Sequence, residues 1–281
     1  MIDLNEIKHL VKSTCHEWIK QKPATLGAAI AFYIIFSLGP ILVITIEIVG
    51  LIFGKQAAED QIVQEIYRII GQKPAEVIKS FIILAYSPPT RIITTILSIP
   101  TVMLGSAMIF FQLKNTLNMI WDVKPRKDKR FVYTLINYGS SFSMVALLGI
   151  LLIILIIKSF SLAIFNDSIG QFLPFPVYLF NIIDLIVTFF VTTILFAMLY
   201  KILPDTYIKW SNIWIGALVT SFMFAIGQFM IGLYISKTDI DTAYGALGSL
   251  TVLLIWIFYS SLIFLAGAVF TKIYSQKNIL K

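Results

Sequence analysis

The sequence predicts an all-α, polytopic membrane protein with six transmembrane helices, an N-terminal amphipathic helix and two short outer amphipathic helices. Of the 281 residues, 58% are hydrophobic and only 13% are charged, whereas soluble domains have about 45–50% and about 25%. Apolar runs recur that are long enough for a helix to cross a bilayer, which takes about 20 residues. These runs are too long and too uniformly apolar for barrel strands, so helices are expected. Residues 1–281 are predicted to form a single integral membrane domain.

An amphipathic helix is predicted over residues 3–22, before the first span. Its apolar face is formed by residues at helical spacing: Ile7, Leu10, Val11, Thr14 and Trp18. Charges occur throughout this segment, which distinguishes it from a signal peptide. Two placements are open: the helix lies along the membrane surface, or it packs on the cytoplasmic ends of the bundle.

Six apolar stretches are predicted to cross the bilayer. They cover residues 27–53, 92–111, 132–157, 177–200, 213–235 and 247–271. Pro40 and Pro100 interrupt the first and second of them, and each proline removes a backbone hydrogen bond and kinks its helix. Interrupted helices line many transport sites, but kinks are at least as common as packing features.

The long outer segment, residues 54–90, is predicted to contain two short amphipathic helices. Apolar side chains share one helical face between Ile62 and Ile70, and again between Val77 and Ala85. Pro74 is suited to the first turn of the second helix. These helices either shield the rim of the bundle or form a lid over an outward cavity.

The distribution of basic residues predicts the orientation of the chain. The N-terminal segment, the second and fourth connections and the C-terminal segment hold 15 lysines and arginines, and the other connections hold 7. The positive-inside rule then places both termini in the cytoplasm. The cluster KPRKDKR at 124–130 is read first as a topogenic signal. It is also a candidate site for anionic lipids, and it is not expected to bind nucleic acid.

Three polar side chains inside the spans give the main functional hypothesis. Glu47 in the first span lies about 9 Å from the outer end at 1.5 Å per residue, and Asp184 in the fourth lies at similar depth. Gln228 lies in the outer half of the fifth span. Because ionisable groups within a bilayer usually mark function, they predict a polar cavity open to the outer side. The alternative is that each acid faces the headgroups or pairs with Arg91.

Residues for covalent chemistry are scarce in this sequence. It contains one cysteine, Cys15, and two histidines, His9 and His16. It contains no P-loop, no HExxH and no GxSxG motif. We therefore expect no catalytic residues, no metal, no cofactor and no enzymatic activity.

Several segments resemble the YihY/BrkB (UPF0761) family of bacterial inner-membrane proteins. They are KPATLGAAIAFYIIFSLGPILV in the first span, NMIWDV at the end of the second, LPDTYIKWSNIWIGAL before the fifth, and YGALGSLTVLLIWIFYSSLIFLAGAVF in the sixth. The resemblance implies six spans with both termini inside. The family-motif positions that it marks are Ser37, Tyr244, Gly245, Gly248, Trp256, Tyr259 and Gly267.

The resemblance also adds two candidate residues to the cavity and shows one position where this sequence differs from the family pattern. It places Tyr33 and Pro40 of the first span among the candidate cavity residues. Val269 stands where the family usually has an acidic residue after the last Gly-Ala, so a mechanism that needs that carboxylate is in doubt for this chain. Some family members carry a ribonuclease label, and the absence of a metal site or acid–base pair argues against that activity here.

These observations favour a transporter or flippase for a lipid or another amphiphilic envelope component, embedded in the lipid bilayer. A bound lipid is the expected substrate, and protonation of Glu47 or Asp184 is a candidate driving force. The alternative is a non-transporting envelope scaffold that recruits partners through the 124–130 loop or the termini.

Overall fold

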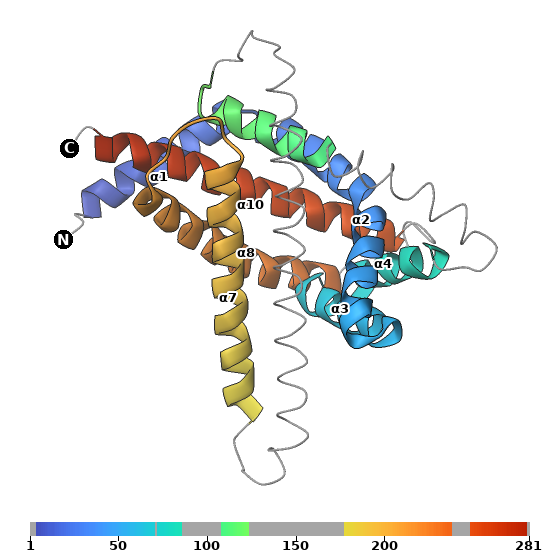
Figure 1. The fold of residues 1–281 in the computed structure, drawn as a ribbon. Coiled ribbons are helices and arrows are strands. Elements are labelled where there is room, and N and C mark those ends of the chain that lie inside the picture. Colours follow the sequence, from blue (N-terminus) through green and yellow to red (C-terminus); the bar gives the residue numbers. More distant parts are fainter. Residues whose placement is uncertain (1–3, 71, 86–107, 124–176, 238–247, 280–281) are drawn as a thin grey trace.

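The structure is a computed structural model that describes residues 4–70, 72–85, 108–123, 177–237 and 248–279. Every regular element in these ranges is an α-helix (Figure 1), which confirms the predicted all-α class for this part of the chain. Most of the predicted second span, all of the third span and the 124–130 loop lie outside the described residues.

The chain begins with two helices that meet at a sharp bend. Helix α1 covers Leu4–Lys20 and helix α2 covers Pro23–Phe53. Their axes differ by 68°, because Lys22 takes a left-handed conformation (φ 51°) and Pro23 then starts the new helix, a position where its missing N–H costs nothing. Helix α2 continues through Pro40 as one element, and Figure 1 shows it bending along its length.

Two short helices follow and pack on the bundle. Helix α3 covers Lys55–Ile70 and starts seven residues before the predicted apolar face, and helix α4 covers Gln72–Ala85. They pack against each other and α2, and α4 also contacts α10. Their buried side chains form one cluster with α2 and the first half of α10: Ile62, Val63, Ala75, Ile78 and Ile82. Burial of this apolar face attaches both helices to the bundle.

Three long apolar helices complete the described fold. Helix α7 covers Val177–Ile202, helix α8 covers Trp210–Lys237 and helix α10 covers Gly248–Ile279. In the described ranges, three helices are long and apolar enough to cross a membrane, or up to four if α1 and the first part of α2 form one bent span. The sixth predicted span is therefore found as α10, which runs eight residues further than expected.

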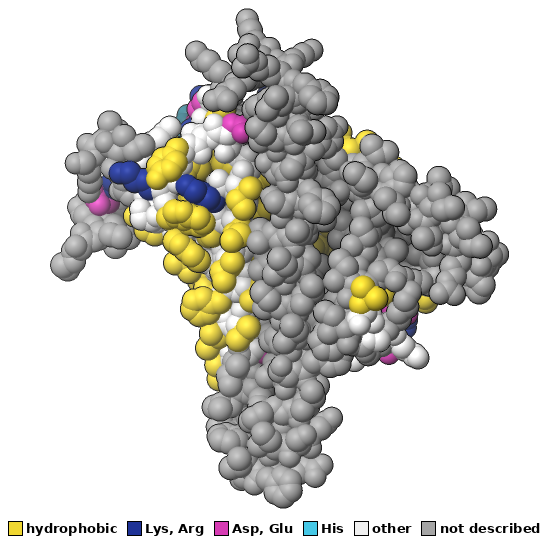
Figure 2. All heavy atoms as spheres, in the orientation of Figure 1, with side chains coloured by type: hydrophobic (Ala, Val, Ile, Leu, Met, Phe, Trp, Pro, Cys, Tyr) yellow, Lys and Arg dark blue, Asp and Glu magenta, His cyan; other side chains and the backbone are white. Residues whose placement is uncertain are grey.

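Helix α10 is the centre of the arrangement and packs against α8, α2, α1 and α4. Helices α7 and α8 also pack together, and their outer faces carry exposed apolar side chains. These include Leu185, Ile186, Phe190, Leu218, Phe222, Ile226, Phe229 and Met230. Figure 2 shows such side chains, in yellow, along the position of α7. An apolar outer face of this extent fits contact with lipid rather than water.

Candidate functional site: a polar network at one end of the bundle

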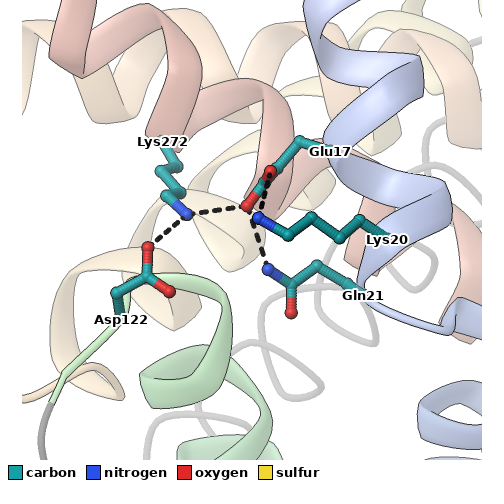
Figure 3. A network of polar contacts seen from close by, with 5 residues as sticks. All are labelled: Glu17, Lys20, Gln21, Asp122 and Lys272. Carbon is teal, nitrogen blue, oxygen red and sulfur yellow. Dashed lines mark hydrogen bonds and ion pairs between the residues drawn. The ribbon is translucent and has the colours of Figure 1, made fainter.

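The most connected polar site in the described residues is centred on Lys272, two turns before the end of α10. Its side chain is only 5% exposed. Its Nζ donates to Glu17 Oε1 at 3.0 Å and to Asp122 Oδ2 at 2.7 Å. Figure 3 shows this amine between the two carboxylates, which come from α1 and from the end of the helical segment 108–120. We call Glu17, Lys20, Gln21, Asp122 and Lys272 the Lys272 network.

Local chain geometry positions the two carboxylates. Asp122 has a left-handed backbone (φ 53°), which aspartate tolerates better than most residues. This residue closes the helical segment, and the N–H of Val123 returns to the carbonyl of Asn118 at 2.9 Å. Directly after α1, Gln21 Nε2 donates to Glu17 Oε1 at 3.0 Å, and on α1 the Nζ of Lys20 lies 3.9 Å from Glu17 Oε2. The network therefore joins three chain segments.

Charge pairing explains why a lysine can be buried here. An ammonium group taken out of water is costly unless carboxylates and hydrogen bonds compensate for the lost hydration. Two carboxylates contact Lys272, and the exposed Lys20 balances part of the remaining negative charge. The hydrogen bond from Lys272 holds the pKa of the Glu17 carboxyl below its ordinary value, with burial acting in the opposite direction.

That pKa direction predicts a pH-dependent attachment of α1. A carboxyl group whose pKa is lowered by folding stabilises the fold above its ordinary pKa, and this contribution is lost as the pH falls. We therefore expect α1 to loosen as the pH falls below the ordinary glutamate value of 4.5. Thermal unfolding of the wild type and Glu17→Gln from pH 7 to pH 3 measures it. The difference between the two proteins should shrink toward acid pH, and a constant difference would contradict the prediction.

A second polar site ties the same end to the α7–α8 connection. Lys114 is nearly buried, and its Nζ lies 2.9 Å from Asp205 Oδ1. One turn later on the same helix face, Asn118 Nδ2 donates to Asp205 Oδ2 at 3.1 Å, and its Oδ1 accepts from the Asp205 N–H at 2.8 Å. Asp205 therefore receives hydrogen bonds from two side chains, which fixes the connection on segment 108–120.

Helices α8 and α10 meet along a stripe of small and polar residues, which we call the Gly–Thr seam: Gly216 and Thr220 of α8, and Gly267 and Thr271 of α10. Thr220 donates to the carbonyl of Gly216, and Thr271 donates to that of Gly267, both at 2.7 Å. Each threonine packs on the glycine of the other helix, where a Cβ would overlap its side chain. This reciprocal contact lets the antiparallel helices approach closely.

Polar side chains extend the seam on both sides. At its end toward the Lys272 network, Asn212 Nδ2 donates to Ser275 Oγ at 3.1 Å. The buried hydroxyl of Tyr200, from α7, donates to the carbonyl of Phe264 at 2.8 Å and lies 3.1 Å from the Thr220 hydroxyl. The Tyr200 side chain thus joins α7 to α8 and α10 at the seam.

The predicted cavity residues are only partly described. Asp184 and Gln228 are half-buried in α7 and α8, and Tyr33 is half-buried in α2. Glu47 and Pro40 lie in α2, but their side chains are outside the described part, and Arg91 is outside it altogether. The convergence of Glu47, Asp184 and Gln228 therefore stays a prediction.

The described family-motif positions lie within the packed part of the helices. Ser37 is buried and its Oγ donates to the Ile34 carbonyl at 3.0 Å. Trp256 lies edge-on against Phe224, with ring centroids 6.1 Å apart. Gly248 is the buried first residue of α10, Tyr259 is half-buried, and Gly267 belongs to the seam. Tyr244 and Gly245 lie outside the described residues.

Sequence reasoning missed the Lys272 network. Lys272 and Lys114 entered only as cytoplasmic charges, and Asp122 only as part of the NMIWDV segment. A usable signal was present, because a lysine that continues an apolar helix without a break is rarely left unpaired. In the described part of the chain, no group of three His, Cys, Asp or Glu residues is arranged to hold a metal ion.

Long apolar helices with exposed apolar outer faces define a multi-pass membrane protein. A sequence model of the family described as "Virulence factor BrkB" matches residues 14–280. The chain belongs to this family, the YihY/BrkB (UPF0761) family.

Curated relatives carry the matching name. The chain is 30% identical to a UPF0761 membrane protein of Ralstonia nicotianae, over 58% of this chain and 35% of that protein. It is 26% identical to one of Mannheimia succiniciproducens, over 62% and 58%. It is 22% identical to one of Alcanivorax borkumensis, over 86% and 54%. The chain thus spans about a third to three fifths of these relatives. No solved structure gives a significant match.

Proposed function

We propose that this protein transports or flips a lipid or another amphiphilic envelope component in the bacterial cytoplasmic membrane, with both termini in the cytoplasm. The observation that carries the proposal is Asp184, an ionisable, half-buried residue at the start of an apolar membrane window, Asp184–Ile202. Ionisable groups within membrane helices are costly and usually belong to substrate or proton pathways. The proposal assigns no covalent chemistry to the chain.

The arrangement of polar contacts supports an outward-facing cavity. The Lys272 network and the Lys114–Asp205 contact link α1, segment 108–123, α10 and the α7–α8 connection at one end of the bundle. The positive-inside rule favours the cytoplasm for this end. A transport pathway that these contacts close at the cytoplasmic end would take up its substrate from the outer side. Helices α3 and α4 pack near the opposite end, on α2 and the first half of α10, and are candidates for a lid.

The decisive experiment follows a labelled phospholipid across vesicles that contain the purified protein. Asp184→Asn and Glu47→Gln are expected to slow translocation at least tenfold if the carboxylates form part of the pathway. Asp60→Asn is the matched control, because it makes the same chemical change at an exposed position on α3. Unchanged flux in both variants would remove the two carboxylates from the mechanism. Wild-type vesicles that translocate the lipid no faster than protein-free vesicles would contradict the proposal and favour the scaffold alternative.

A further inference from the structure

The connection between α7 and α8 brings two lysines, Lys201 and Lys209, together with two exposed aromatic side chains. Tyr207 is 85% exposed and Trp210 is 47% exposed, and Lys209 between them is also exposed. The apolar windows of both helices stop at this connection, at Ile202 and at Trp210. Tyrosine and tryptophan are enriched at this depth because they combine an apolar ring with a polar group.

Lys201 organises this connection. Its Nζ donates to the carbonyl of Ile208 at 2.7 Å. The same atom lies 4.5 Å from the ring centre of Tyr207 and 5.4 Å from that of Trp210. Two aromatic faces and one carbonyl thus hold a half-buried ammonium group at the surface, and this arrangement leaves donor capacity on the amine.

The charge of this site is not compensated within the described residues. Asp205 is the acidic residue of the connection, and it pairs with Lys114. Within the described ranges, neither Lys201 nor Lys209 forms an ion pair. Figure 2 shows Lys or Arg side chains, in dark blue, beside the hydrophobic surface near this end of α7. The local excess of positive charge therefore favours the binding of an anion.

We propose that Lys201, Tyr207, Lys209 and Trp210 form a binding site for the headgroup of an anionic phospholipid. The lysines would hold the phosphodiester as point charges, and the aromatic rings would lie along the first part of the acyl chains. The site shares no residue with the cluster at 124–130, and it does not depend on whether the protein transports anything.

Native mass spectrometry of the purified protein with phosphatidylglycerol and phosphatidylcholine tests the site. We expect the wild type to prefer phosphatidylglycerol, and Lys209→Glu to reduce its binding about tenfold or more through loss and reversal of one charge. Lys79→Glu is the matched control, since it makes the same change at an exposed position on α4. Equal losses in the two variants, or none in Lys209→Glu, would overturn the proposal.

A double lysine variant and a soluble competitor test the site further. Lys201→Gln combined with Lys209→Gln should abolish the preference for phosphatidylglycerol; Lys209→Glu alone decides the matter if that double variant fails to fold. Soluble glycerol phosphate should not displace the bound lipid, because the aromatic rings contribute only through acyl chains. Displacement by glycerol phosphate at similar concentration would overturn the assignment to a lipid.

Discussion

Replacing Gly267 with alanine is expected to destabilise the protein by about 2–3 kcal/mol, the cost of forcing extra volume into a packed site. A Cβ at this position would overlap the side chain of Thr220 and press on the hydroxyl of Tyr200. Thr220 cannot move aside easily, because its hydroxyl is bonded to the Gly216 carbonyl of its own helix. Helix propensity alone would make Gly267→Ala stabilising by about 1 kcal/mol. A loss of stability would therefore have to come from the steric overlap.

Thermal unfolding in detergent measures this effect, and the chain offers a matched control. Gly232 lies on α8, and a Cβ there would meet nothing within 4 Å. Gly232→Ala should therefore be neutral or slightly stabilising. Gly216→Ala should behave like Gly267→Ala, because its Cβ would overlap Thr271 in the same way. Indistinguishable melting temperatures for Gly267→Ala and Gly232→Ala would show that the helices are not closely packed at the seam.

The double variant Glu17→Gln with Asp122→Asn is expected to cost about 3 kcal/mol, the typical loss when a buried ion pair loses one partner. It leaves the ammonium group of Lys272 buried without a carboxylate contact from either segment. The reverse change, Lys272→Met alone, should cost less. Asp122 is 72% exposed, so water can solvate its carboxylate when the lysine is removed.

A triple variant separates charge burial from a general loss of contacts. Adding Lys272→Met to the double variant removes the unpaired charge and keeps an apolar side chain of similar length. Replacing a whole buried ion pair by apolar groups is often neutral, so the triple variant should recover most of the lost stability. If the triple variant unfolds as readily as the double variant, the network does not act through charge pairing.

Much of the fold could be predicted because the bilayer imposes a length on apolar helices. The predicted span 177–200 and helix α7 differ by two residues at one end. The end of α10 was misplaced because Lys272 looks like a stop signal in the sequence. In the structure, α1 covers this lysine and supplies Glu17, so the helix continues to Ile279.

The Lys272 network could not be predicted in the same way. Glu17 and Lys272 are separated by 255 positions in the chain, and helical periodicity carries no information on pairs so far apart. Glu47, Asp184 and Gln228 were selected by depth alone, which gives a height within the membrane but not a direction around each helix axis. The transport experiment therefore has to test whether these residues share one pathway.

The reciprocal fit of glycine and threonine between α8 and α10 limits how this protein can change shape. Sliding or twisting one of these helices against the other would move each threonine off its glycine and against residues that have a side chain. The two helices must consequently travel as one rigid body during any working cycle. Relative motion then takes place where this body meets its other neighbours, α1, α2 or α4, and spectroscopic labels intended to detect it belong on those helices.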